Sequence, residues 1–132
     1  MILLDTSILI DLLTNKLKAK EVIFKYKDAP MGISVVTLAE LEIGFLFFPT
    51  KRQKEARGKF HELIKNGTLE VFEVTSKIAL EYAQLQAELL KDGKPISGFD
   101  GLVATTAKVF NTTLITSDSG FNRIKELKII QP

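Results

Sequence analysis

The chain has 132 residues, of which 45% are hydrophobic and 26% charged, a balance that excludes a disordered protein. Its length suits one domain spanning residues 1–132, and the absence of cysteine excludes disulfides and thiolate metal sites. The net charge of +2 says little about partners, and with His61 as the only histidine any metal must be held by oxygen.

The apolar segments are too short for a membrane protein. None approaches the roughly 20 residues of a membrane-spanning helix, and the opening apolar run is too short for a signal peptide. A chain without cysteine also fits a reducing compartment. We therefore expect a cytoplasmic location and no membrane partner.

The predicted elements alternate between strands and helices. Residues 1–4 form an unbroken apolar run, which is typical of a strand buried on both faces. Thr6 and Ser7 are candidate caps for a helix that reaches about Leu13. The later pattern predicts helices over 16–26, 37–48, 51–66, 75–92 and 97–110, a short helical piece after 117–120, and strands over 31–35, 69–74, 113–116 and 127–130. This alternation favours a three-layer α/β/α sandwich around a parallel five-stranded sheet.

Acidic residues recur where strands end and helices begin. Asp5 follows the first strand and Asp118 the fourth, while Glu40 completes a capping-box pattern with Thr37 at the start of a helix. Because parallel strands all end at one edge, topology places these three acids together. Asp100 is not fixed in this way, since its helix follows another helix.

Two interpretations of the acids remain open. Taken singly, each fits a helix cap, where carboxylates are favoured. Taken together, crowded carboxylates repel one another unless a cation holds them. One or two Mg²⁺ or Mn²⁺ ions would suit these oxygen ligands and could activate water against a nucleic-acid phosphodiester. Glu42 lies two positions from Glu40 and points elsewhere on the helix, so we assign it to solvent or a surface pair.

Four segments that each carry one of these acids resemble known motifs. They are Leu3-Leu4-Asp5-Thr6-Ser7, Ser34-Val35-Val36-Thr37-Leu38-Ala39-Glu40-Leu41, Phe99-Asp100-Gly101-Leu102-Val103-Ala104 and Thr116-Ser117-Asp118-Ser119-Gly120-Phe121. In this order they resemble the four acidic motifs of the PIN-domain family, and within it the small VapC-type toxins, over essentially the whole chain.

The resemblance implies a Mg²⁺- or Mn²⁺-dependent endoribonuclease with a sheet ordered 3-2-1-4-5. It implies that Asp5, Glu40, Asp100 and Asp118 are the catalytic and metal-binding residues. It further implies support of the site by the hydroxyls of Thr6, Ser7 and Thr116. Gly101 departs from the pattern, because a larger residue is commoner there, and we expect it to loosen the start of its helix.

The resemblance also implies a homodimer and a protein antitoxin that holds the enzyme inactive. The segment 43–48 is too apolar to form one core stripe, so we expect a partner interface that includes Phe45, Phe47 and Phe48. The substitution Phe47→Asp should then weaken assembly.

A basic cluster follows this apolar segment. Lys51, Arg52, Lys54 and Arg57 form either a solvated helix face or a contact with the RNA backbone. His61 is expected to be a surface or partly packed side chain.

Other functions are compatible with parts of this pattern. A PIN nuclease of RNA maturation or decay would need no antitoxin, and a non-catalytic RNA-binding PIN protein would have a broken acidic set, whereas this set is intact. A haloacid-dehalogenase-like phosphatase would need a second aspartate where Ser7 stands.

Overall fold

The computed structural model describes all residues 1–132 and contains one parallel sheet of five strands, ordered β3-β2-β1-β4-β5. Its central strand β1 (Ile2–Leu4) pairs with β2 (Met31–Ser34) on one side and β4 (Thr113–Ile115) on the other. The outer strands are β3 (Leu69–Phe72) and β5 (Ile129–Ile130). The predicted class and strand order are confirmed.

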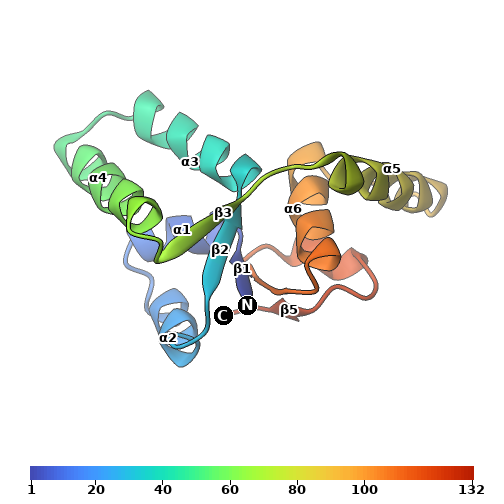
Figure 1. Ribbon diagram of the computed structural model, residues 1–132, viewed down its shortest axis with the longest axis horizontal. Helices are drawn as coiled ribbons and strands as arrows, with labels where there is room; N and C mark the ends of the chain where they lie inside the picture. Colours follow the sequence, from blue (N-terminus) through green and yellow to red (C-terminus); the bar gives the residue numbers. More distant parts are fainter.

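Helices cover both faces of this sheet. They are α1 (Thr6–Leu13), α2 (Leu17–Lys25), α3 (Val35–Phe47), α4 (Lys51–Lys65), α5 (Ser76–Lys91) and α6 (Gly98–Val109), with a 3₁₀ helix η1 (Ser119–Arg123) after β4. Figure 1 shows α3 and α4 as a helical hairpin on one side of the sheet and α5 with α6 on the other. None of the helices has the length and apolar character needed to cross a membrane.

The core divides into two clusters because side chains alternate across a strand. In β1, Leu3 joins the cluster under α5 and α6, whereas Ile2 and Leu4 join the cluster under α1 to α4. In β4, Leu114 and Ile115 divide in the same way. Burial on both faces explains the unbroken apolar run of β1.

Two helix starts differ from the sequence prediction. The N-cap of α1 is Asp5, whose side chain accepts the N–H of Ser7, so neither Thr6 nor Ser7 is the cap. The cap of α3 is Ser34, whose hydroxyl accepts the N–H of Val36. Glu40 is therefore not in the first turn of α3, and the predicted capping box with Thr37 was wrong.

The expectation that Gly101 loosens its helix was also wrong. α6 is regular from Gly98 onward, with Ser97 as its N-cap. A Cβ atom at Gly101 would lie 2.4 Å from Cε2 of Tyr82, far inside van der Waals contact. The glycine therefore allows α5 and α6 to approach closely, which fixes the position of the neighbouring Asp100.

Candidate active site

The carboxylate of Asp5 is the fixed point of the site. It lies at the carboxyl end of β1 with an exposure of only 3%. Its Oδ2 accepts the hydroxyls of Ser7 at 2.7 Å and Thr116 at 2.8 Å, together with the N–H of Ser7 at 3.3 Å. Its Oδ1 accepts no hydrogen bond from the protein, so one oxygen is held in place and the other is available to a ligand.

The same two hydroxyls join Asp5 to the segment of Asp118. Thr116 Oγ1 accepts the N–H of Asp118 at 3.0 Å, and Ser7 Oγ accepts the N–H of Ser117 at 2.9 Å. The Asp118 side chain caps η1 through the N–H of Gly120 at 2.7 Å and is exposed to solvent. Pairing of β1 with β4 thus brings two acids, more than 100 residues apart in sequence, to one edge.

Glu40 reaches this edge from the second turn of α3. Its Oε1 accepts the hydroxyl of Thr6 at 2.8 Å, which ties α3 to the start of α1. Burial raises the pKa of Glu40 above its ordinary value, the Thr6 hydrogen bond lowers it, and the charges of Asp5 and Asp100 raise it further. Glu40 therefore lies within electrostatic reach of two of the other acids.

Asp100 reaches the edge from the first turn of α6. Its N–H donates to the hydroxyl of Ser97 at 3.2 Å. Burial raises the pKa of Asp100, hydrogen bonding with Ser97 lowers it, and the charges of Asp5 and Asp118 raise it further. The acid that topology alone left unplaced is thus brought to the other three.

The donor chemistry of the four acids fits a hard divalent cation. All the candidate ligands are carboxylate oxygens, and each acid keeps at least one oxygen that accepts no hydrogen bond. The pKa values of Glu40 and Asp100 are raised first by burial and further by repulsion from the neighbouring acids, and a cation would oppose both effects. No group of three acids converges closely enough to hold one ion as the side chains stand. The residues therefore fit the ion in kind and place, and their side chains would have to close on it.

The apolar segment at the end of α3 is split between core and surface. Phe45 is 5% exposed and packs against Phe60 of α4, with ring centroids 6.2 Å apart. Its assignment to a partner interface was wrong, because its ring is buried between the two helices of the hairpin, α3 and α4. Phe47 and Phe48 are 74% and 61% exposed, and Phe48 borders a groove of about 380 Å³ between α1, α3 and α4.

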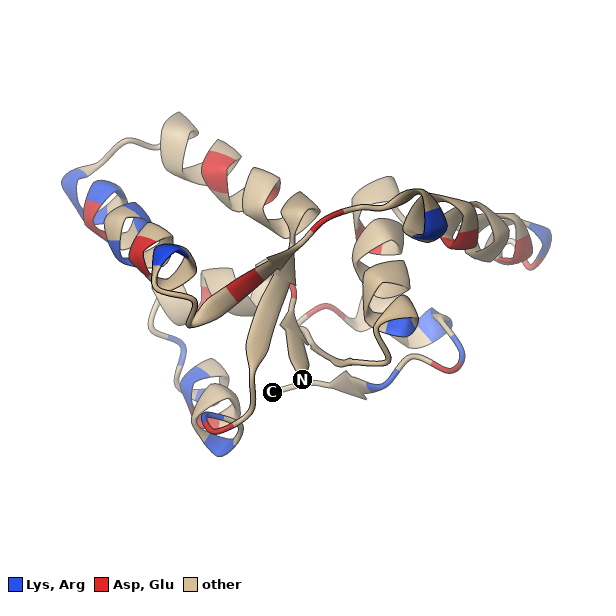
Figure 2. Cartoon of the chain, in the orientation of Figure 1, with Lys and Arg blue, Asp and Glu red and all other residues tan.

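The basic cluster lies on α4, whose ribbon carries several blue segments in Figure 2. Lys51, Arg52 and Lys54 are exposed. Arg57 donates through Nε and Nη2 to Glu42 at 3.0 and 2.8 Å, so its charge is compensated within the hairpin. His61 also contacts Glu42, which confirms the surface pairing expected for Glu42 and the surface position of His61.

One charged residue beside the acids was missed by the sequence analysis. Arg123 ends η1, and its positive charge lowers the pKa of Asp100 against the larger effect of burial. The signal was present, because Arg123 follows Asp118 within a single short helical piece. It was hidden because the placement of Asp100 could not be derived from topology.

The family model for the PIN domain matches residues 2–127. Toxin FitB of Neisseria gonorrhoeae is 27% identical over all of this chain and 98% of its own length. Ribonuclease VapC2 of Rickettsia felis is 32% identical over 79% of this chain and 71% of its own. The solved structure of VapBC2 from Rickettsia felis, bound to a DNA fragment from their promoter, aligns with a TM-score of 0.83 at 26% identity, over 99% of this chain and 98% of that one. The chain belongs to the PIN-domain family.

Proposed function

We propose that this protein is a Mg²⁺- or Mn²⁺-dependent endoribonuclease and the toxin of a toxin–antitoxin pair. The observation that carries the proposal is the gathering of Asp5, Glu40, Asp100 and Asp118 at one sheet edge, where two of them have raised pKa values. The names of the curated relatives, a toxin and a ribonuclease, support the same activity.

Each acid has a distinct task in this proposal. Asp5 presents Oδ1 in a fixed direction because three donors hold Oδ2. Glu40 is oriented by Thr6, and Asp118 moves with Asp5 through the hydroxyl of Thr116. Asp100 approaches from the first turn of α6, within electrostatic reach of Asp5 and Asp118.

All four acids would hold the metal. When bound, a divalent metal supplies an activated water and neutralises charge that develops on the phosphodiester. The hydroxyls of Thr6, Ser7 and Thr116 would keep the acids oriented while the substrate enters, because second partners of this kind fix the direction of metal ligands.

The proposal includes a protein partner because the α3–α4 hairpin exposes apolar side chains to solvent in addition to those that it buries. Ile43, Leu46, Phe47 and Phe48 are each more than 60% exposed. An exposed cluster of this kind favours a binding surface. We propose that it serves assembly with the antitoxin or within a homodimer.

The test is cleavage of a labelled pool of structured RNAs by the wild-type protein and by Asp5→Asn, with Mg²⁺, Mn²⁺ or EDTA. We expect cutting that requires the metal and falls by at least about 10²-fold in the variant, because a fixed charge at the reacting centre is removed. Asp28→Asn is the matched control, since Asp28 is exposed in the turn before β2 and makes no hydrogen bond through its side chain. Cutting that survives both EDTA and Asp5→Asn would overturn the mechanism.

A further inference from the structure

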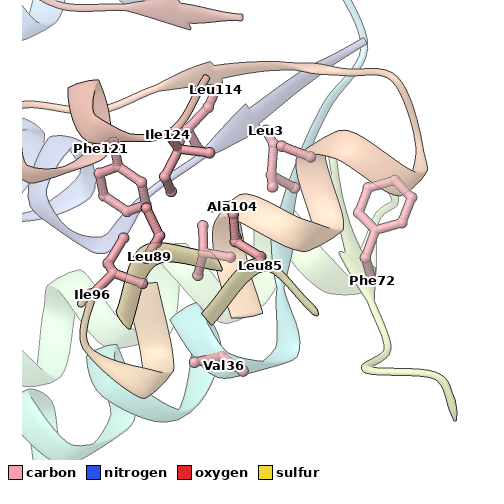
Figure 3. Packing of buried hydrophobic residues seen from close by; sticks show 12 residues of the cluster. Leu3, Val36, Phe72, Leu85, Leu89, Ile96, Ala104, Leu114, Phe121 and Ile124 are labelled. Atoms are coloured by element: carbon pink, nitrogen blue, oxygen red, sulfur yellow. The ribbon is translucent and has the colours of Figure 1, made fainter. Parts of the chain in front are cut away.

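Arg123 is exposed to solvent on a short helical segment whose neighbouring side chains are buried. It ends η1, the 3₁₀ helix capped by Asp118. Its neighbours Phe121 and Ile124 are 0% and 4% exposed and lie in the core beneath α5 and α6, as Figure 3 shows. Because Phe121 and Ile124 are held in the core, the backbone of Arg123 between them has a defined position.

The guanidinium of Arg123 is anchored to the segment that leads to Asp100. Its Nη1 donates to the carbonyl of Pro95. The next residue, Ile96, is buried in the same cluster as Phe121 and Ile124 (Figure 3). Arg123 therefore bridges the two acid-bearing segments, one that begins at Asp118 and one that leads into α6.

This cation is not neutralised by an ion pair. The ion pairs of the structure involve Lys16, Arg57 and His61, and none involves Arg123. It lies between the two acid-bearing segments, at the end of the η1 helix that Asp118 caps and against the carbonyl of Pro95, five residues before Asp100. A guanidinium has five N–H donors. The Pro95 carbonyl accepts from Nη1, so the donors on Nε and Nη2 remain free for a ligand.

The substrate of the proposed reaction makes such a cation useful. RNA is a polyanion, so its backbone is repelled by four carboxylates unless positive charge lies beside them. Arginine suits this task because its planar donors match two oxygens of one phosphate. We propose that Arg123 binds a phosphate of the RNA backbone next to Asp100 and Asp118. The proposal deepens the proposed nuclease function and rests on it.

The test is the affinity of the full chain for labelled single-stranded RNA at several salt concentrations, in the Asp5→Asn background so that the RNA stays intact. We expect Arg123→Gln to weaken binding about tenfold, because a charge-assisted contact is lost. The slope of log affinity against log salt should fall by about 0.7, the value for one phosphate contact on a single strand. Arg123→Lys should keep the slope and lose part of the affinity.

Lys125→Gln is the matched control, because Lys125 is exposed two positions away and has no hydrogen bond or ion pair. It should bind RNA within about twofold of its parent. An unchanged affinity and slope in Arg123→Gln would overturn the proposal. A weaker affinity with an unchanged slope and a lower melting temperature would also overturn it, since Arg123 would then only hold the Pro95 segment.

The nuclease proposal and the Arg123 proposal can fail separately. A wild-type protein that binds RNA but cuts none would overturn the nuclease, and the salt slope would still decide the role of Arg123. Metal-dependent cutting with an unchanged slope in Arg123→Gln would uphold the nuclease and overturn the phosphate contact. A wild-type protein that binds no RNA would overturn both.

Discussion

Two regions of the molecule lack a binding partner: the sheet edge that carries Asp5, Glu40, Asp100 and Asp118, called here the acid edge, and the α3–α4 hairpin. They differ in the kind of partner that they need. At the acid edge, hydrogen bonds from Ser7 and Thr116 hold the backbone and one carboxylate rigidly, while negative charge is left in excess. In the hairpin, charge is compensated by the Glu42–Arg57 pair, while apolar side chains such as Phe47 remain in water. One region needs a cation and the other an apolar partner, so each should respond to a different kind of substitution.

The largest expected effect is a difference in stability between substitutions of a buried and of an exposed phenylalanine in the hairpin. Phe45→Ala should lower the free energy of unfolding by about 3–5 kcal/mol, because it leaves a cavity beside Phe60. Phe47 lies two residues further along α3 and is exposed, so Phe47→Ala should change the free energy of unfolding by no more than about 0.5 kcal/mol. Urea unfolding of both variants measures the difference, and equal losses would contradict the division of this segment into core and surface.

The same contrast bears on assembly. Phe47→Asp should reduce the mass of the assembled protein in size-exclusion chromatography, because it places a charge in the proposed interface. Phe24→Asp is the matched control, since Phe24 is 68% exposed on α2, outside the hairpin. An unchanged mass for Phe47→Asp would count against the interface.

At the acid edge, Thr116→Val tests whether the hydroxyl network matters. The change removes a donor from Asp5 and an acceptor from the N–H of Asp118, in a side chain with 0% exposure. We expect RNA cutting to fall by about 10–100-fold and stability by about 1–3 kcal/mol. Thr116→Ser should retain most of the activity, and Thr116→Val with wild-type cutting would show that Asp5 does not depend on this contact.

The smallest effect is a dependence of stability on pH. Glu40 and Asp100 have pKa values raised above 4.5 and 3.8, so near these values the folded protein binds protons that the unfolded chain has released. In EDTA, the contribution of these two acids to the free energy of unfolding should therefore decline as the pH rises through their raised pKa values. Both side chains are partly exposed, and solvent screening limits each loss to about 1 kcal/mol or less.

Substitution and metal addition check this expectation. Asp100→Asn should be more stable than the wild type at neutral pH in EDTA, and Mg²⁺ should stabilise the wild type more than the variant. Asp11 and Glu42 have lowered pKa values and act in the opposite sense, but they act equally in both proteins. A stability difference between Asp100→Asn and the wild type that does not grow as the pH rises from about 4 to 7 would contradict the sign.

The sequence was informative where one local rule decides the structure. Continuous apolar runs predicted the buried strands. The helix starts predicted at 51, 75 and 97 are confirmed to within one residue, and the structure caps these helices with Thr50, Thr75 and Ser97. It was misleading where two rules competed, as at α3, where the hydroxyls of Ser34 and Thr37 both suited a cap. Ser34 is the cap because β2 ends there.

The packing of individual side chains between distant segments could not be predicted. The burial of Phe45 depends on the angle between α3 and α4, and the role of Gly101 depends on the approach of Tyr82. The position of Arg123 depends on the loop that carries Pro95. None of these contacts leaves a local pattern in the sequence.

The link between Asp5 and Thr116 has a consequence for the protein as it is synthesised. Three of the four acids lie within the first 100 residues and therefore emerge from the ribosome before β4. β1 cannot pair with β4 until residues 113–115 have also emerged. Domains generally fold as units during synthesis. We therefore expect a nascent chain to remain harmless to the RNA around it for most of its elongation, and to become active only when nearly all of it has been made.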